Sequence, residues 1–399
     1  MLTTWRIRCG IAAYTEALVD ALTNRLGIQV EVVPITPGLR SKEEYLEQAG
    51  RLNACDVVHI QHEYSFWGGF VPGKNRFFQV ARRIRRPRVI TAHTTSPLEQ
   101  LIVLPEVPPN ARGKDLARIL YRRLRMKAVL PLLRRFRPYR EWIEAAPFAW
   151  ADHVIVHTHM AAEELARRSI QPGRIHVIPA GVPEATVIAD GGVGFRRRFQ
   201  IPDGRVISVF GYVTPFKGYE LVLEALPHLP QDVVFVIAGG ARTSNDEPYV
   251  RNLQQRIKAG GLERRVFVTG FLSDVEASGA MAASEIVLLP HTVATGSYSV
   301  TLPLAHGKAM VASDLACFAE LARSAGCVDL FRAGDAGHLA ERIRAVLEDD
   351  AYRIRLAGAA AAYAADNSWT RVAERTLEVY RAAACLHDTH GQAGLSATS

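Results

Sequence analysis

Short apolar runs alternate with stretches of helical periodicity along nearly the whole chain. One such run, Val206–Phe210, is bounded by polar residues and glycine, which is typical of a fully buried strand. After the next loop, Leu221, Val222 and Leu226 recur at helical spacing, which predicts a helix. Repeated strand and helix patterns at this pitch predict a mostly parallel sheet with helices on both faces.

The alternation forms two series, each about as long as one domain. The strands predicted in the first series are Met1–Trp5, which is short, Val30–Ile35, Asp56–His62, Val89–Thr94, Ala151–Thr158 and Ile175–Pro179. Those of the second series are Val206–Phe210, Val233–Ala238, Val266–Val268, Ile286–Leu289, Val311–Ser313 and Cys327–Leu330. The predicted helices include 11–22, 77–84, 161–168, 250–259, 277–283, 302–305, 336–348 and 352–364, and a basic helix at 112–137. We therefore expect two doubly wound α/β domains, which bind ligands at the carboxyl ends of their strands.

A segment rich in glycine and proline, Gly181–Phe199, interrupts the alternation, and we place the domain linker there. The predicted domains are then 1–190 and 200–367. A separate helix is expected over 368–386, and the polar tail over 387–399 is expected to be disordered.

The composition is that of a globular protein, with 48% hydrophobic and 22% charged residues. The five cysteines are scattered without C-x-x-C spacing, which argues against a zinc site or a disulfide framework and predicts a reducing compartment. The first residues lack the apolar segment of a signal peptide, and no apolar run is long enough to span a membrane. These features predict a cytoplasmic protein.

The net charge of +8 is concentrated in one stretch. Residues Arg82–Arg140 contain sixteen Arg or Lys against three acidic residues. A field of this sign favours polyphosphates or anionic lipid headgroups. The stretch contains no nucleic-acid-binding motif, so nucleic acid is not an expected partner. It predicts peripheral contact with the inner face of an anionic membrane, unless it is simply a solvated, arginine-rich face.

The loop Gly211–Gly218 combines a strand end, a tight turn, a lysine and a helix start. Free backbone N–H groups and the helix dipole at such a position both favour an anionic ligand. Lys217 would add a positive charge at its edge. An ordinary turn with a solvated lysine is the alternative interpretation.

Nine segments in the same order resemble the GT-B glycosyltransferases of the retaining, glycogen-synthase-like superfamily, which includes glycosyltransferase family 4. The first, RCGIAAYT at 8–15, is similar to the CGIA-Y loop of one bacterial branch. The others are HIQHEY at 59–64, TAHT at 91–94, DHVIVHT at 152–158, VIPAGV at 177–182, GYVTPFKG at 211–218, VIAGG at 236–240, VTGFL at 268–272 and GKAMVASD at 307–314. The resemblance extends from about residue 4 to about residue 384.

This resemblance implies two Rossmann-like domains facing across a cleft, with the C-terminal helix returning to the N-terminal domain. It implies that the C-terminal domain holds a nucleotide-sugar donor and that the N-terminal domain holds a hydroxyl acceptor (a glycan, a lipid-linked or a small-molecule glycoside). A hexosyl unit would be transferred with retention, in polysaccharide or glycolipid biosynthesis. No metal or other cofactor is expected.

The resemblance also assigns residues. His93 matches the histidine that faces the donor sugar, and Lys217 matches the diphosphate lysine, so these two are the catalytic candidates. Negative charge develops on the diphosphate as the glycosidic bond breaks, and cations and N–H groups stabilise it. The matched donor-binding residues are Gly10, Gly211, Tyr212, Lys217, Gly240, Phe271, Leu272, Thr295, Gly296, Ser297 and Ser299. His62 and Glu63 fall in the acceptor-facing loop. A backbone-bonded His93 and a core position for Phe271 and Leu272 are the structural alternatives.

Two departures from the family pattern leave other functions open. Tyr212 stands where relatives carry a phosphate-binding arginine, and Ala294 and Leu302 stand where they carry paired glutamates. The hydroxyls of Thr295, Ser297 and Ser299 could replace part of that chemistry. A catalytically weak or inactive homologue that acts as a regulatory subunit is therefore the alternative function. A phosphorylase would need a longer chain with a pyridoxal-phosphate lysine, which nothing here indicates.

Overall fold

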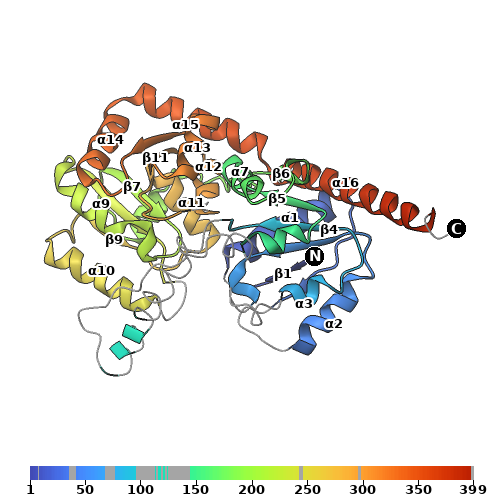
Figure 1. Cartoon of the computed structure of the whole chain (residues 1–399). Coiled ribbons are helices and arrows are strands. Elements are labelled where there is room, and N and C mark those ends of the chain that lie inside the picture. Colours follow the sequence, from blue (N-terminus) through green and yellow to red (C-terminus); the bar gives the residue numbers. More distant parts are fainter. Residues whose placement is uncertain are drawn as a thin grey trace. The chain divides into compact units, whose positions relative to one another are not determined.

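The computed structural model describes residues 1–7, 9–35, 42–67, 77–95, 144–241, 246–294 and 298–396, and the single positions 113, 116, 117, 120, 121 and 124. Two compact units account for the chain (Figure 1). Unit 1 consists of Met1–Thr15, Gln29–Ile178 and Arg375–Ser399, and unit 2 of Glu16–Ile28 and Pro179–Glu374. Apart from the single positions, the basic helix expected at 112–137 lies outside the described residues.

Unit 1 contains a parallel sheet with strand order β2-β1-β3-β4-β5-β6. The strands are β1 (Leu2–Thr3), β2 (Val33–Pro34), β3 (Val58–His62), β4 (Arg88–Ala92), β5 (His153–Val156) and β6 (Ile175–Val177). All six were expected from the sequence, and β1 is as short as predicted although it pairs with both β2 and β3. The next two strands of the sheet, β3 and β4, are paired over their full lengths, from Val58 opposite Arg88 to His62 opposite Ala92.

The helices of unit 1 surround this sheet. They are α2 (Lys42–Leu52), η2 (Tyr64–Trp67), α3 (Phe77–Ala81), a helix over 144–149, α7 (His159–Arg167) and η3 (Pro172–Arg174), with the first part of α1 (Gly10–Asp20) and the part of α16 (Trp369–Ser396) that begins at Arg375. The end of α1 and the π-helical turn η1 (Ala21–Arg25) that follows it group with unit 2. Residues from α2, α3 and α7 pack with Val58, Ile60 and other strand residues in one apolar core. Residues 16–28 group with unit 2, where Arg25 forms an ion pair with Glu184 and a hydrogen bond with Thr370.

Unit 2 contains a second parallel sheet with strand order β12-β11-β10-β7-β8-β9. Its strands are β7 (Arg205–Phe210), β8 (Val233–Ala238), β9 (Val266–Val268), β10 (Ile286–Leu289), β11 (Ala309–Ser313) and β12 (Val328–Phe331). The strand order reverses between β7 and β10, as in doubly wound dinucleotide-binding sheets. The two predicted α/β domains are therefore confirmed as a fold class.

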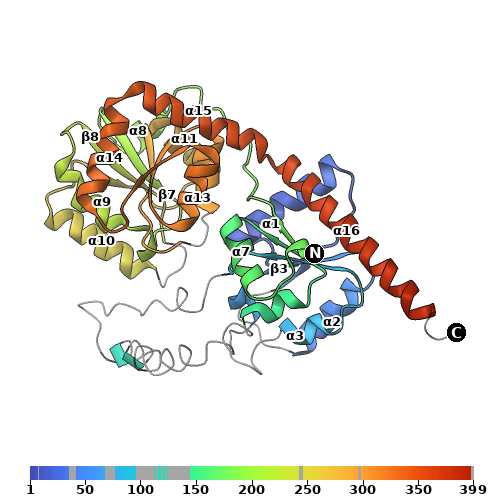
Figure 2. The same cartoon turned by 45° about the horizontal axis from the view of Figure 1, so that its top comes forward.

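Both faces of the unit 2 sheet are buried because apolar residues occupy successive positions in its strands. In β8, Val233, Phe235 and Ile237 join one core, and Val234, Val236 and Ala238 join the other. The first core contains α9 (Tyr219–Ala225), α10 (Glu247–Ala259) and α14 (Ala336–Glu348). The second contains α8 (Val193–Arg198), α11 (Asp274–Ala283), α12 (Thr301–Ala305) and α13 (Ala316–Ala325), and α15 (Asp350–Asp366) contributes to both. Figure 2 shows α9 and α14 on one side of β7 and α11 and α13 on the other.

Short 3-10 turns complete unit 2, namely η4 (Pro215–Lys217), η5 (Leu226–His228) and η6 (Tyr298–Val300). The structure differs from the sequence-based expectation at both proposed boundaries. The expected linker contains α8, because Phe195 anchors that segment in the core of unit 2. The expected disordered tail is helical as far as Ser396, as a continuation of α16. In the described part of the chain, no helix is both long and apolar enough to cross a bilayer.

Candidate functional site

The loops that follow β7 and β10 meet where the strand order of unit 2 reverses, and this is where doubly wound sheets bind ligands. Backbone hydrogen bonds hold the loop after β7 in place. The N–H of Gly211 donates to Ala238 O at 3.1 Å, and the N–H of Val213 donates to Gly240 O at 2.9 Å. The N–H of Thr292, after β10, donates to Phe216 O at 2.9 Å. These bonds join the loops after β7, β8 and β10.

Lys217 is the cation of this site, and it is 9% exposed. Its Nζ donates to Phe210 O at 2.6 Å and to Ser299 Oγ at 3.3 Å. Among the described residues, no carboxylate forms an ion pair with it. Burial lowers the pKa of Lys217 to about 8. The fold therefore holds a desolvated amine that an anion would stabilise in its charged form.

Glycine is required beside this lysine. Gly211 has a φ of +108°, and a Cβ there would lie 2.5 Å from Lys217 Nζ. Gly240 allows a different close approach, because a Cβ would lie 2.8 Å from the backbone nitrogen of Phe271. At both positions the backbone comes close to another group of the protein, and a role of these glycines in donor binding stays a prediction.

The other predicted donor residues occupy different environments. Phe271 is 58% exposed, whereas its neighbour Leu272 is 8% exposed and belongs to the apolar core, which corrects its assignment to a ligand contact. The carbonyl of Tyr212 accepts a hydrogen bond from Tyr219 Oη at 3.5 Å. Thr295, Gly296 and Ser297 lie outside the described residues.

His291 was not predicted, yet it lies near Lys217. Burial, together with the charge of Lys217, lowers the pKa of His291 to about 3, so the ring is neutral. Its carbonyl accepts a hydrogen bond from Ser313 Oγ at 2.8 Å. Its position directly after the buried strand β10 and Pro290 is the only sequence signal that could have identified it.

In unit 1, His93 lies just after β4 in a cluster of polar rings. Its Nε2 is 2.8 Å from Gln61 Oε1, and its Nδ1 is 3.3 Å from His157 Nε2. The ring of Tyr14 on α1 meets it edge-on, with ring centroids 5.1 Å apart. Burial lowers the pKa of His93 well below 6.5, and His157 and His59 lower it further. Both ring nitrogens of His93 therefore contact side chains. The alternative, in which the ring is hydrogen-bonded to the backbone, does not apply.

His62 does not belong to this cluster, which corrects its assignment to the acceptor. It points to the opposite face of β3, is fully buried, and packs against the rings of Tyr64, Phe77 and Phe148. Neither of its ring nitrogens has a hydrogen-bond partner among the described residues. Burial lowers its pKa to about 3. A neutral ring enclosed in this way is a core residue.

The remaining candidates of unit 1 stay predictions. Glu63 is partly exposed, and its Oε2 accepts a hydrogen bond from Thr94 Oγ1 at 2.6 Å. Gly10 is exposed and is the first residue of α1, where backbone N–H groups lack helical partners.

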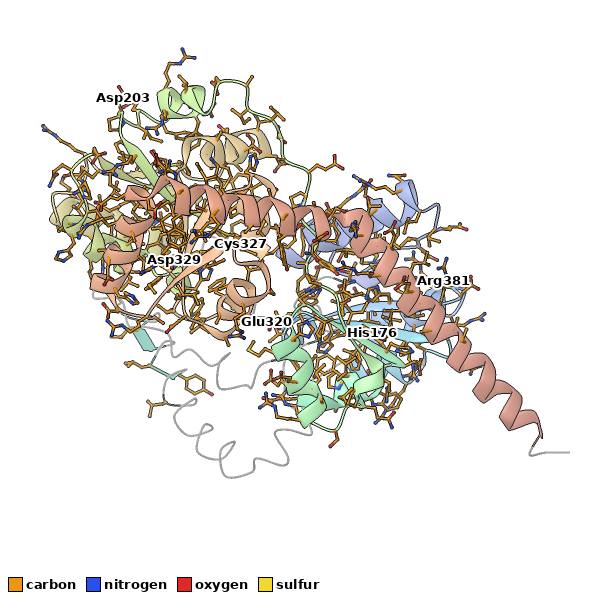
Figure 3. All side chains as sticks on the ribbon, turned by 90° about the horizontal axis from the view of Figure 1, so that it is seen from above. His176, Asp203, Glu320, Cys327, Asp329 and Arg381 are labelled. Carbon is orange, nitrogen blue, oxygen red and sulfur yellow. The ribbon has the colours of Figure 1, made fainter. Side chains whose placement is uncertain are left out.

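Gln61, His59 and Tyr380 are the polar residues that the sequence analysis missed. His59 Nδ1 is 2.6 Å from Tyr380 Oη on α16, and His59 Nε2 is 2.7 Å from Thr91 Oγ1 on β4. The alternation in β3 is the signal that could have found them, because His59 and Gln61 share one face while His62 shares the other with Ile60. No sequence pattern of this kind identifies Tyr380, because it lies on the distant helix α16. Figure 3 labels its neighbour Arg381 on α16.

Comparisons with known proteins agree with this architecture. Residues 195–363 match the family model "Glycosyl transferases group 1", and residues 44–186 match "Glycosyltransferase Family 4". A D-inositol 3-phosphate glycosyltransferase from Xylanimonas cellulosilytica is 26% identical over 337 residues, 82% of this chain and 71% of the relative. A phosphatidyl-myo-inositol mannosyltransferase from Mycobacterium leprae is 30% identical over 187 residues, 45% of this chain and 47% of the relative. The chain thus matches about half of the length of that second relative.

Solved structures share the fold of the whole chain. The Anabaena HepE protein in complex with UDP has a TM-score of 0.69 at 18% identity, over 96% of this chain and 98% of its own. A sucrose-phosphate synthase from Thermosynechococcus elongatus has a TM-score of 0.68 at 17% identity, over 95% and 98%. Two doubly wound sheets with these neighbours define the GT-B class. Within that class, the two matched family models show that the chain belongs to the family-4-like glycosyltransferases.

Proposed function

We propose that this glycosyltransferase takes a hexosyl unit from a nucleotide-diphosphate sugar and transfers it to a hydroxyl group with retention. The observation that carries the proposal is the buried Lys217 at the point where the strand order of unit 2 reverses. Its charge has no carboxylate partner in the described residues, and the absence of a Cβ at Gly211 makes room for its amine. A diphosphate would supply the missing negative charge.

In this proposal the bond between the sugar's anomeric carbon and the diphosphate oxygen breaks while a bond to the acceptor oxygen forms. The departing diphosphate takes the proton of the acceptor hydroxyl, as the family resemblance implies. Lys217 and the N–H groups of the loop 211–218 stabilise the charge that develops on the diphosphate. His93 acts at the transferred sugar. Lys217 can reach the phosphates by leaving the carbonyl of Phe210, because its side chain is a flexible stem.

The names of similar proteins support a choice of first substrates. HepE was solved with UDP and with UDP-glucose, which favours a uridine nucleotide as the donor. Two relatives act on inositol phosphate or phosphatidylinositol by name, which favours an inositol-bearing acceptor. These substrates are the ones to test first.

The test combines binding with transfer. Purified protein is incubated with UDP-, GDP- or dTDP-sugars and with myo-inositol phosphate or phosphatidylinositol, and products are measured by mass spectrometry. We expect one donor to raise the apparent melting temperature and to support transfer. Binding without transfer to any acceptor would favour the regulatory alternative, and no binding of any donor would contradict the proposal.

A matched pair of variants assigns the effect to the site. Lys217→Met should weaken binding of the nucleotide by about 2 kcal/mol or more, the scale of a lost charge-assisted contact. Lys308→Met is the control, because Lys308 is also a partly buried lysine of unit 2 but precedes β11 at the other end of the sheet, where its Nζ donates to Ser284 O at 2.9 Å. The control variant should bind as the natural protein does.

Contact with an anionic membrane is a separate proposal. Arg82, Arg83, Arg85 and Arg86 are exposed and line a groove of about 820 Å³ with residues of α2. Vesicles with increasing anionic lipid should bind the protein in low salt and release it in high salt. Binding that ignores both variables would contradict this proposal.

A further inference from the structure

A continuous set of polar contacts crosses unit 1 from α16 to the end of β6. Tyr380 contacts His59, and the side-chain amide of Gln61 lies between His59 and His93, at 3.4 Å and 2.8 Å. His93 then contacts His157. The last contact joins His157 Nδ1 to the backbone carbonyl of Ile178 at 3.0 Å. Figure 1 shows β4 and β5, the strands that His93 and His157 follow, next to each other.

The carbonyl at the end of this set fixes the direction of the hydrogen bonds. A carbonyl oxygen only accepts, so the Nδ1 of His157 must carry a proton. Burial lowers the pKa of His157, so its ring is neutral and its Nε2 is a bare acceptor. That acceptor faces His93 Nδ1 at 3.3 Å. A hydrogen bond exists there only if His93 carries its proton on Nδ1, because otherwise two lone pairs would face each other.

The rest of the set follows from this assignment. A neutral His93 with a protonated Nδ1 has a bare Nε2, which needs a donor. The two ends of the Gln61 amide exchange places by a half-turn, and hydrogen bonding therefore directs its NH₂ group to His93. The Nε2–H of His59 then has two acceptors, Thr91 Oγ1 at 2.7 Å and the amide oxygen at 3.4 Å, and His59 Nδ1 accepts from the hydroxyl of Tyr380. Every member is satisfied with neutral rings.

We infer that His157 and Gln61 are positioning residues that hold His93 as a neutral ring protonated at Nδ1. The inference rests on the proposed function, in which His93 acts at the transferred sugar. Both ring nitrogens of His93 form hydrogen bonds within unit 1, one with Gln61 and one with His157. The ring therefore exchanges no proton with the substrates during transfer. The groups that face His93 are Tyr14 on α1, Gln61 on β3 and His157 after β5, and the titratable side chains that act on it from further away are His59 and His62. None of them is a carboxylate that would favour the imidazolium form.

The direct test is nitrogen-15 NMR of the histidine side chains in the full chain, which separates the two neutral tautomers and the imidazolium. We expect His93 to be protonated at Nδ1 only, with no change between about pH 5.5 and pH 8, since its pKa lies well below 6.5. A neutral ring protonated at Nε2, or a titration near pH 6.5, would overturn the inference. This readout needs no substrate, so it stands apart from success or failure of the proposed function.

Variants at position 157 test whether His157 orients His93 through a hydrogen bond or only packs against it. In His157→Gln the new side-chain oxygen can still accept from His93 Nδ1–H, whereas His157→Leu offers no acceptor. We expect His157→Leu to change the His93 tautomer and to lower kcat about tenfold with little change in KM for the donor, as a misplaced group does. His157→Gln should keep the tautomer and most of kcat. Equal losses in both variants, with the His93 tautomer unchanged, would overturn the inference.

A second histidine pair on the same strand provides the control. His153, at the start of β5, has its Nδ1 2.8 Å from Nε2 of His176, which is labelled in Figure 3. His176→Phe removes a ring contact next to the same strand without touching His93. We expect it to leave the His93 signals and kcat unchanged. A shift of the His93 tautomer in this variant would mean that any disturbance of β5 suffices, and would count against a specific role for His157.

Discussion

Units 1 and 2 each contain a six-stranded parallel sheet, yet the residues at the carboxyl ends of the strands differ in kind. In unit 1 they form a network of neutral rings and an amide around His93, in which each polar group has a partner. In unit 2 they form glycine loops around one buried amine, Lys217, whose charge lacks an ionic partner among the described residues.

This difference teaches that the same fold supports two kinds of polar site. The network of unit 1 is satisfied without a ligand, so it can hold a side chain in one orientation. The loop of unit 2 is incomplete in charge, so a bound anion adds the stabilisation that burial has removed. We therefore assign binding energy for the donor mainly to unit 2 and orientation of the reacting group to unit 1.

Acidification should separate the two units most strongly, because more histidines have lowered pKa values in unit 1 than in unit 2. In unit 1 they are His59, His62, His93, His153, His157 and His176, and in unit 2 they are His291 and His306. Burial lowers the pKa of His59 and His62 to about 3, below the unfolded value of 6.5, so the unfolded chain binds more protons as the pH falls. Stability is therefore complete above pH 6.5 and is lost toward pH 3. Each of these two residues should cost about 2 kcal/mol at pH 5.

Hydrogen exchange at pH 7 and pH 5 measures this effect in each unit. The amides of β3 and β4 should lose more protection than those of β7 and β8. His62→Phe, which keeps an aromatic ring in the same apolar surroundings, should reduce the loss by the contribution of one histidine, about 2 kcal/mol at pH 5. Equal loss in both units, or an unchanged acid response in the variant, would refute the assignment of this sensitivity to buried imidazoles.

Gly211→Ala should have the next largest effect. The φ of +108° is unfavourable for alanine, and the new methyl group would displace Lys217 Nζ. We expect a loss of about 1–3 kcal/mol in stability, together with weaker nucleotide binding. In unit 1, Gly10→Ala at the exposed start of α1 should change stability little. Chemical denaturation and calorimetry measure both quantities, and a Gly211→Ala variant that binds normally would contradict the role of this loop.

Substitutions of the neighbours Phe271 and Leu272 should have the smallest effects, and the two should differ in whether they weaken nucleotide binding or lower stability. Phe271→Ala should leave stability unchanged and should weaken nucleotide binding by about 1 kcal/mol, the scale of a stacking contact. Leu272→Ala should instead lower stability by about 2 kcal/mol or more, because it opens a cavity in the core of unit 2. Thermal unfolding with and without UDP compares the two variants. The reverse pattern would show that the exposed ring is not a ligand contact.

The sequence predicted the strands of both sheets well because parallel strands are buried on both faces and appear as apolar runs. Strand ends were less accurate, since β6 ends at Val177 rather than at Pro179. Helices that cover little apolar surface, such as α2, give a weak pattern and were missed. The segment containing α8 was misread as a linker because its glycines outweighed the single anchoring residue, Phe195.

The positions of Lys217 and His93 were predictable because each follows a buried apolar run that marks a strand, whereas their roles in binding and transfer stay predictions. The site was not predictable where a partner comes from a distant element. Tyr380 lies 321 positions after His59 in the sequence, and no local pattern indicates this contact. His62 was misassigned because it stands next to Glu63 in a recognisable motif, although its parity in β3 places it with Ile60 in the core.

The most direct test of the account is the affinity for UDP at pH 7 and pH 9, in the natural protein and in Lys217→Met, measured by calorimetry at constant ionic strength. Free Lys217 loses its proton near pH 8, and a diphosphate favours the protonated form, so affinity should fall about tenfold between these pH values. Lys217→Met should bind weakly at both values with no such dependence. Equal affinity of the natural protein at both pH values, or tight binding by the variant, would contradict the central claim that Lys217 binds the donor diphosphate.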